Sequence, residues 1–251
     1  MSAPRPGRLR ALGRIGRQAL GGAGNLVRRS FGPSLEPRRI WFEVTDRCNS
    51  RCTHCSIWQR RPDTPPLTLA EIERTFRDPL FRNIEAIINS GGEPALREDM
   101  VEILRLEHRL FPRASLDYST NGLMPERAIA VAKAMVEDRI PLEIGLSLDG
   151  VGERHDAFRG CPGNFAKVDY LLGELQRLRT LAGGLIEPCI GFTLSPLTLD
   201  NYEEVRAYAA ARGVPLAVQW YNNSSFYENT GHAPSEAEKA RMDAIVRALP
   251  R

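Results

Sequence analysis

The strongest constraint on the fold is a regular alternation of short apolar runs and longer segments of helical periodicity from residue 39 onward. Alternation of this kind favours parallel strands with helices outside. It repeats six times, which is too few for a closed eight-stranded barrel. We therefore expect an α/β fold, a partial (β/α)6 TIM-type barrel that is open on one side. The predicted strands are Ile40–Val44, Ile84–Ile88, Leu116–Thr120, Leu142–Leu148, Ile186–Leu194 and Leu216–Trp220.

Signals at the helix ends support the same layout. Thr68 and Ser235 are each followed three residues later by Glu, which is the capping-box pattern of a helix N-terminus. Further helices are expected near 126–137 and 165–182. The helix after the fifth strand should stop at Gly213, because glycine is common just past a helix C-terminus.

Residues of the fourth predicted strand alternate in polarity. Side chains alternate between the two faces of a strand. Leu142, Ile144, Leu146 and Leu148 therefore share one face, and Glu143, Gly145, Ser147 and Asp149 share the other. The fifth strand alternates in the same way. The apolar faces should meet the helices, so the polar faces should line the lumen. Since an ordinary barrel fills its lumen with Val, Ile and Leu, this lumen is expected to hold a ligand.

The basic charge is concentrated at the N-terminus. Residues 1–40 have a net charge of +8, whereas the whole chain has +3. We divide the chain into a basic, flexible segment (1–38) and one folded domain (39–251). The basic segment has two alternative interpretations. It could make a weak contact with a membrane surface or a partner protein, or it could be a mitochondrial transit peptide. Because the charge is local, no nucleic-acid partner is predicted. No apolar run is long enough to span a bilayer and no secretory leader is evident, so we expect a cytoplasmic protein.

Three of the five cysteines lie in one short stretch, Cys48-Asn-Ser-Arg-Cys52-Thr-His-Cys55. An odd number of cysteines clustered in this way favours a metal site over a disulfide framework. The stretch follows the first predicted strand, where the catalytic rim of such a barrel lies. Thiolates are the usual ligands of iron–sulfur clusters. A zinc site is the alternative, although structural zinc wants four ligands.

This chain resembles the radical S-adenosylmethionine (SAM) superfamily. The motif of that family is Cys-x3-Cys-x-Φ-Cys after the first strand, and His54 holds the Φ place here. The second family motif, Gly-Gly-Glu-Pro after the second strand, matches Ser90-Gly91-Gly92-Glu93-Pro94. The resemblance covers residues 39–250. Within the superfamily, the chain is similar to the branch of molybdenum-cofactor cyclases and peptide maturases. No cysteine follows Cys189, so no C-terminal auxiliary-cluster domain is expected within this chain.

The resemblance implies a role for each matching residue. Cys48, Cys52 and Cys55 would ligate one [4Fe–4S] cluster, whose fourth iron SAM would chelate. Gly91 and Gly92 would let the backbone approach the methionine part of SAM, because no Cβ blocks it. The remaining SAM contacts would come from Ser90, Glu93, Thr120, Asn121, Ser147 and His54, with Gln219–Asn222 bordering the adenine. Strand-end Ser, Thr and Asn also cap helices and satisfy turns, which is the alternative for these polar residues.

The implied reaction is reductive cleavage of SAM followed by hydrogen abstraction. An electron donor resembling flavodoxin or ferredoxin would reduce the cluster. The resulting 5′-deoxyadenosyl radical would take a hydrogen atom from a peptide or small metabolite, which makes the protein an oxidoreductase. Cys161 is the one candidate catalytic residue, as a hydrogen donor, and an ordinary loop thiol is the alternative.

Several other polar residues of the predicted lumen have two interpretations. They are candidate substrate contacts or members of structural ion pairs, and they are Glu143, Asp149, Arg159 and Glu187. Cys189 is expected to be a packing residue within the fifth strand. Two further functions remain open at this point, an inactive iron–sulfur or SAM-binding scaffold for a partner protein and a zinc-stabilised binding module.

Overall fold

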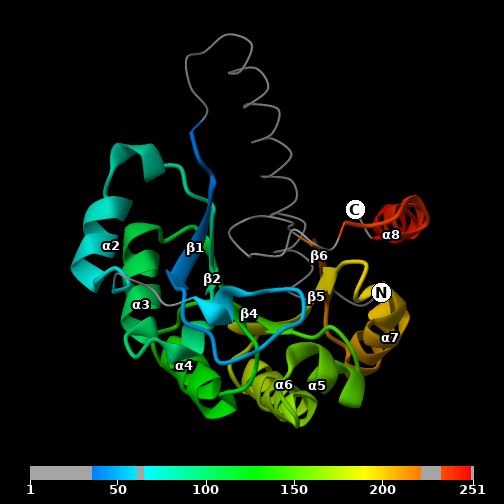
Figure 1. Ribbon diagram of the computed structural model, residues 1–251. Helices are drawn as coiled ribbons and strands as arrows, with labels where there is room; N and C mark the ends of the chain where they lie inside the picture. Colours follow the sequence, from blue (N-terminus) through cyan, green and yellow to red (C-terminus); the bar gives the residue numbers. More distant parts are fainter. Residues whose placement is uncertain (1–35, 61–64, 222–232, 250–251) are drawn as a thin grey trace, which may run out of the picture.

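The computed structural model describes residues 36–60, 65–221 and 233–249. Six strands alternate with helices along the chain (Figure 1). The strands are β1 (Arg39–Thr45), β2 (Ala86–Gly91), β3 (Ser115–Thr120), β4 (Leu142–Ser147), β5 (Ile186–Leu194) and β6 (Leu216–Trp220). The α-helices are α2 (Leu69–Phe76), α3 (Met100–Leu110), α4 (Pro125–Glu137), α5 (Glu153–Arg159), α6 (Asn164–Leu181), α7 (Tyr202–Arg212) and α8 (Glu236–Ala248). Short 3-10 turns are η1 (Ile57–Gln59), η2 (Pro79–Phe81), η3 (Pro94–Leu96) and η4 (Leu199–Asn201).

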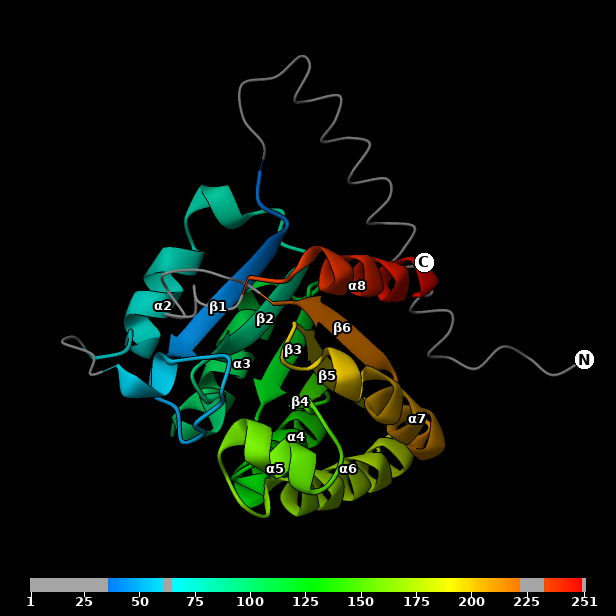
Figure 2. The same cartoon turned by 45° about the vertical axis from the view of Figure 1, so that its right-hand side comes forward.

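All six strands are parallel and pair in chain order, β1-β2-β3-β4-β5-β6. The sheet curls, with β1 and β6 at its two edges (Figure 2). The architecture is a curled half-barrel with helices outside, which confirms the predicted fold class. Because the strands are parallel, all their carboxyl ends lie at one rim, and loops that follow different strands meet there.

The burial of β4 explains why its sequence alternates. Leu142, Ile144 and Leu146 are fully buried and belong to the apolar core between the sheet and its helices. Glu143, Gly145 and Ser147 are only partly buried on the opposite face. Removing the apolar face from water drives the packing of helices on the outside. The predicted division between helix-facing and lumen-facing residues is therefore confirmed.

Both predicted capping boxes are present. The Thr68 hydroxyl accepts a hydrogen bond from the Glu71 amide, and the Ser235 hydroxyl accepts one from the Glu238 amide. In each case the glutamate side chain accepts from the cap residue's own amide. These reciprocal bonds satisfy donors that a helix N-terminus would otherwise leave unpaired.

The helix α5 is the main element that the sequence analysis missed. It lies in the connection after β4, which was expected to be a loop. Its buried residues are His155, Phe158 and Arg159. Two of these three are polar, so the segment lacks the apolar periodicity that identifies an amphipathic helix. Some strand boundaries differ by one or two residues, as where β2 begins at Ala86 and β4 ends at Ser147.

Of the basic N-terminal segment (1–38), residues 1–35 lie outside the described residues, so the expectations for it stay predictions. Within the described residues, no helix combines the length and the apolar character that crossing a bilayer requires.

Candidate active site

The segment that carries the three clustered cysteines, residues 46–56, leaves the carboxyl end of β1 and runs across the rim toward α5 (Figure 2). We call it the cysteine loop. It is held on one side by residues 91–93, 120 and 121, which we call the β2–β3 flank. On the other side it is held by Asp149, His155, Phe158 and Arg159, which we call the α5 flank.

The three predicted cluster ligands lie on this one loop. Cys48, Cys52 and Cys55 are all partly buried and free of disulfides. Burial, together with the neighbouring Cys52, Glu93 and Cys55, raises the pKa of the Cys48 thiol to about 12. Burial likewise raises the pKa of Cys55. Without a bound cation, this site thus disfavours thiolates, whereas a metal cluster would supply the positive charge that stabilises them.

Gly91 and Gly92 let the cysteine loop approach β2 closely. The Gly92 amide donates to the Thr45 carbonyl at 2.7 Å, and the Glu93 amide donates to the Arg47 carbonyl at 2.8 Å. A Cβ on Gly91 would lie 2.3 Å from the Thr45 oxygen, and one on Gly92 would lie 2.0 Å from the Arg47 oxygen. In this structure the chain's own backbone already excludes a Cβ at both positions, and the close approach of these glycines to SAM stays a prediction.

Glu93 joins β2 to β3 beneath the loop. Its carboxylate is fully buried. One oxygen accepts from the Thr120 hydroxyl at 2.8 Å and the Ala95 amide at 3.0 Å, and the other accepts from the Asn121 amide at 2.7 Å. Burial raises its pKa, although these three hydrogen bonds oppose the shift. This internal role was not expected from the sequence, and the contact of Glu93 with SAM stays a prediction.

Asn121 connects the β2–β3 flank to the first cysteine. Its side-chain amide donates to Asn49 Oδ1 at 2.8 Å and lies 3.9 Å from Cys48 Sγ. Its carbonyl accepts from the Asn164 side chain at 3.0 Å. The structure therefore brings the predicted residues Glu93, Thr120 and Asn121 together beside Cys48.

Backbone hydrogen bonds attach the loop to the end of α5. The amides of Arg51 and Thr53 donate to the carbonyls of Arg159 and Phe158, at 3.0 and 2.9 Å. His54 stacks on Phe158 with ring centroids 4.9 Å apart and also meets the edge of Tyr221. His54 therefore lies at the rim beside the end of β6, and its contact with SAM stays a prediction. Asn222 lies outside the described residues.

A buried ion pair reaches the second cysteine from the α5 flank. Arg159 Nη2 lies 2.6 Å from Asp149 Oδ2, and their side chains are 8% and 0% exposed. Arg159 Nη1 lies 3.5 Å from Cys52 Sγ. Asp149 is fixed in turn by the Thr193 amide of β5, at 3.0 Å. Of the two interpretations left open for Arg159 and Asp149, this geometry favours the structural ion pair.

His155 is a buried residue to which the sequence analysis gave no role. Its Nδ1 accepts from the Asp149 amide at 3.2 Å, so Nε2 carries the proton and bonds Asn164 Oδ1 at 3.1 Å. Burial lowers the pKa of His155 to about 4, so the ring is neutral at pH 7. The chain from His155 through Asn164 to Asn121 links the two flanks. A buried histidine without periodic context gives no sequence signal for such a link.

The other predicted lumen residues lie on the polar face of the sheet. Ser90 is opposite Glu43 in register, and Ser147 is opposite Gly191. The Cys189 thiol is buried 3.8 Å from the Glu143 carboxylate. Glu187 pairs with Arg179 at 2.9 Å, which favours the ion-pair interpretation for Glu187 as well.

Cys161 follows α5 directly and touches the cysteine loop. Its Sγ lies 3.9 Å from the Asn49 carbonyl, and its amide bonds the Asp156 carbonyl at 3.0 Å. The thiol is therefore at the rim, near Cys48, as expected. Its role as a hydrogen donor stays a prediction.

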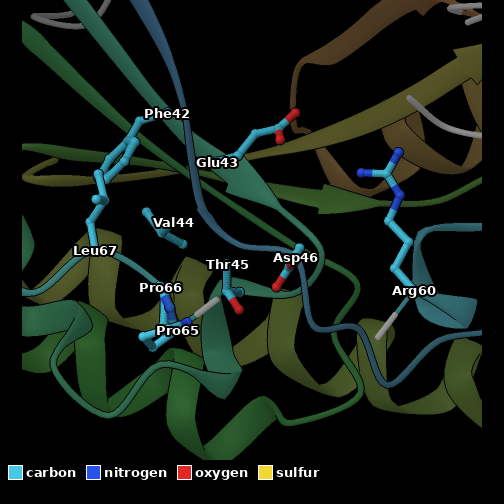
Figure 3. Close-up of a pocket in the computed structure, with 9 residues that line it drawn as sticks. All are labelled: Phe42, Glu43, Val44, Thr45, Asp46, Arg60, Pro65, Pro66 and Leu67. Carbon is cyan, nitrogen blue, oxygen red and sulfur yellow. The ribbon is translucent and has the colours of Figure 1, made fainter. Parts of the chain in front are cut away.

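A cavity of about 310 Å³ flanks β1 where the cysteine loop begins. Figure 3 shows Phe42 and Leu67 on one side of the strand and Glu43 and Arg60 on the other. Burial raises the pKa of Glu43, and the nearby Arg60 opposes the shift. The cavity adjoins the rim but is not lined by any of the three clustered cysteines.

Comparison with known proteins is decisive for the family. The family model of the radical SAM superfamily matches residues 42–179. The chain belongs to the radical SAM superfamily. It is 34% identical over 222 residues to the pre-heme d1 synthase of Dinoroseobacter shibae, covering 85% of this chain and 51% of that protein. It is 33% identical to the GTP 3',8-cyclase of Mycobacterium marinum, covering 78% of this chain and 53% of that protein.

A solved structure shows the same fold. Streptococcus suis SuiB bound to S-adenosylmethionine superimposes with a TM-score of 0.64 at 16% identity, covering 84% of this chain and 47% of SuiB. SuiB has also been solved bound to its precursor peptide SuiA. At this identity the likeness concerns the fold alone. The chain spans about half the length of the relatives it matches.

The residues at the rim fit the cofactors of the radical SAM superfamily, a [4Fe–4S] cluster and SAM. The donor set is three thiols on one loop, which is the chemistry of an iron–sulfur site with one iron left open. Within the described residues, no group of three or more Cys, His, Asp or Glu is gathered around one point as a single metal ion requires.

Proposed function

We propose that this chain is the catalytic core of a radical SAM enzyme that cleaves SAM reductively and takes a hydrogen atom from its substrate. The observation that carries the proposal is the placement of Cys48, Cys52 and Cys55 on one loop at the rim, between two buried polar flanks. Cys48, Cys52 and Cys55 would each bind one iron of the [4Fe–4S] cluster.

The protein supplies position and shielding. When bound by Cys48, Cys52 and Cys55, a reduced cluster would supply the single electron that cleaves SAM to methionine and a 5′-deoxyadenosyl radical, which would end as 5′-deoxyadenosine after taking a hydrogen atom from the substrate. Asn121 and Glu93 would fix the Cys48 end of the loop, and Arg159 the Cys52 end. Ser90, Gly91, Gly92, Thr120, Ser147 and His54 would face SAM. The partly buried polar faces of β4 and β5 would hold the substrate out of bulk water, which a carbon radical requires.

Two further parts of the proposal concern the partners. The electron would come from a one-electron donor of the flavodoxin or ferredoxin type. The substrate would be a peptide or a small metabolite, since relatives are named for haem d1 and GTP chemistry and a structural neighbour binds a precursor peptide. All five cysteines are free thiols, which supports a reducing cytoplasmic environment.

Anaerobic reconstitution with iron and sulfide tests the proposal. We expect about 4 Fe per chain, an electron paramagnetic resonance (EPR) signal of the reduced cluster that SAM perturbs, and 5′-deoxyadenosine after dithionite is added. Cys52→Ala should lose the cluster. Cys189→Ala is the matched control, because Cys189 is buried in β5 away from the loop, and it should keep the cluster.

Three other outcomes would each contradict a different part of the proposed function. A full cluster without 5′-deoxyadenosine would overturn the catalytic proposal in favour of a scaffold. Stoichiometric zinc without a cluster would overturn both. A full cluster in Cys52→Ala would overturn the ligand assignment.

A further inference from the structure

The Arg159–Asp149 ion pair has a location that packing alone does not explain. Both side chains are buried, and Arg159 Nε has no hydrogen-bond partner within the described residues. Burying two charges costs hydration that their attraction only partly returns, so a buried pair is weak evidence for stabilisation. A gain in stability therefore does not account for the pair, and its effect on the neighbouring cysteine loop has to be considered.

The pair is held rigidly and it is oriented. Asp149 is anchored by the Thr193 amide at 3.0 Å, and its carbonyl accepts from the Asn201 side chain at 2.8 Å. Arg159 closes α5, where its carbonyl accepts from the Arg51 amide of the cysteine loop at 3.0 Å. The guanidinium lies between Asp149 and Cys52 Sγ. The positive end of this dipole thus faces the cysteine loop.

A fixed cation beside a cluster ligand favours the more negative redox state of the cluster. Reduction adds one electron, and the attraction between that electron and a nearby positive charge is strong where water is excluded. Hydrogen bonds to ligand sulfurs act in the same direction. Arg159 offers both, because Nη1 lies 3.5 Å from Cys52 Sγ.

We propose that Arg159, held by Asp149, is a positioning residue that orients Cys52 and raises the reduction potential of the cluster bound to the loop. This inference rests on the proposed function. It adds a residue outside both sequence motifs, because Arg159 follows Cys55 by more than a hundred positions in the chain.

An EPR-monitored redox titration of the reconstituted protein without SAM tests this inference. At the wild-type midpoint potential, we expect Arg159→Gln to lower the ratio of reduced to oxidised cluster at least tenfold, which equals about 59 mV for one electron. Arg159→Lys keeps the charge but not the planar guanidinium. Its midpoint potential should lie between those of the wild type and Arg159→Gln. Arg154→Gln is the control, since Arg154 lies on the same helix, is 65% exposed and pairs at 3.7 Å with Glu204.

A second variant separates the effect of the lost charge from the effect of unfolding. Removing Arg159 alone leaves Asp149 buried without its partner, which is strongly destabilising. The double variant Asp149→Asn with Arg159→Gln removes both charges, and we expect a smaller fall in potential there, because no uncompensated carboxylate is left beside the loop. A midpoint equal to wild type in this double variant, with about 4 Fe per chain, overturns the inference and leaves the proposed function standing. Equal midpoints in Arg159→Lys and the double variant would overturn the role of charge. Failure of the wild-type protein to bind a cluster overturns the proposed function instead.

Discussion

The two flanks of the cysteine loop support it by different physical means. The β2–β3 flank brings backbone against backbone, through Gly92 and the amide of Glu93. The α5 flank also bonds the loop backbone, but it adds a charged guanidinium beside Cys52 and a stacked ring beneath His54. The β2–β3 flank thus needs positions without a Cβ beside the polar contact of Asn121 with Asn49, whereas the α5 flank supplies a charge and an aromatic ring. Substitutions at the glycines should act sterically, and those of the charged and buried polar groups on the α5 flank electrostatically.

The largest effect is expected from Gly92→Ala. The new Cβ would lie 2.0 Å from the Arg47 carbonyl oxygen, a backbone atom that cannot move aside as a flexible side chain can. We expect a loss of about 3 kcal/mol or more of unfolding free energy, measured in urea, together with loss of the cluster.

Gly173→Ala is the matched control for this prediction. Gly173 lies within α6 and a Cβ there meets nothing within 4 Å. Alanine is the better helix former by about 1 kcal/mol, so this variant should be slightly more stable than wild type. Equal stability of Gly92→Ala and wild type would contradict the steric account of the β2–β3 flank.

The two flanks also differ in how far the sequence predicts them. The fold follows from alternation, because apolar burial sets the pattern of β4 and β5. Gly91, Gly92 and Glu93 were found as a motif, but the close approach of the Thr45 and Arg47 carbonyls to the two glycines was not, because only the folded chain brings these atoms near. The α5 flank was missed as a structure, because its buried face contains His155 and Arg159 and thus has no apolar period. Polar contacts between residues far apart in the chain leave no recognisable pattern in the local sequence.

A second prediction uses pH to isolate the α5 flank. The pKa of His155 is about 4 in the folded protein and 6.5 ordinarily, because burial disfavours the charged ring. The unfolded chain therefore binds more protons, so the stabilisation is present above pH 6.5 and is lost as the pH falls toward 4. Replacing His155 by Gln should cost about 2 kcal/mol less at pH 5 than at pH 7.5, as measured by urea unfolding at both pH values.

Glu107→Gln is a control whose unfolding free energy, relative to wild type, should change with pH in the opposite direction. Glu107 is buried on α3, away from both flanks, and accepts a hydrogen bond from Asn89 at 2.8 Å. Burial raises its pKa from 4.5 to about 8, so its ionisation destabilises the fold as the pH rises through this range. Relative to wild type, Glu107→Gln should gain about 3 kcal/mol between pH 5 and pH 7.5. A pH-independent cost of His155→Gln would rule out a neutral buried ring.

The smallest effect is expected from Thr120→Val on the β2–β3 flank. Valine keeps the shape of threonine but removes the hydroxyl that donates to Glu93 Oε1 at 2.8 Å and accepts from the Gly122 amide at 3.1 Å. Glu93 retains its bonds from Ala95 and Asn121, so its carboxylate is not left without donors. We expect a loss of about 1 kcal/mol in urea unfolding, with the cluster retained.

Thr180→Val provides the comparison, because the exposed Thr180 hydroxyl bonds the Gln176 carbonyl within α6 and water can replace that bond. Its cost should be within about 0.5 kcal/mol of zero. If Thr120→Val instead lost the cluster while remaining folded, the Thr120 hydroxyl would have to act on the cofactors directly. The polar groups of the β2–β3 flank would then act on the cofactors as the α5 flank is proposed to do, and the steric fit at Gly92 would not be what distinguishes the two sides of the loop.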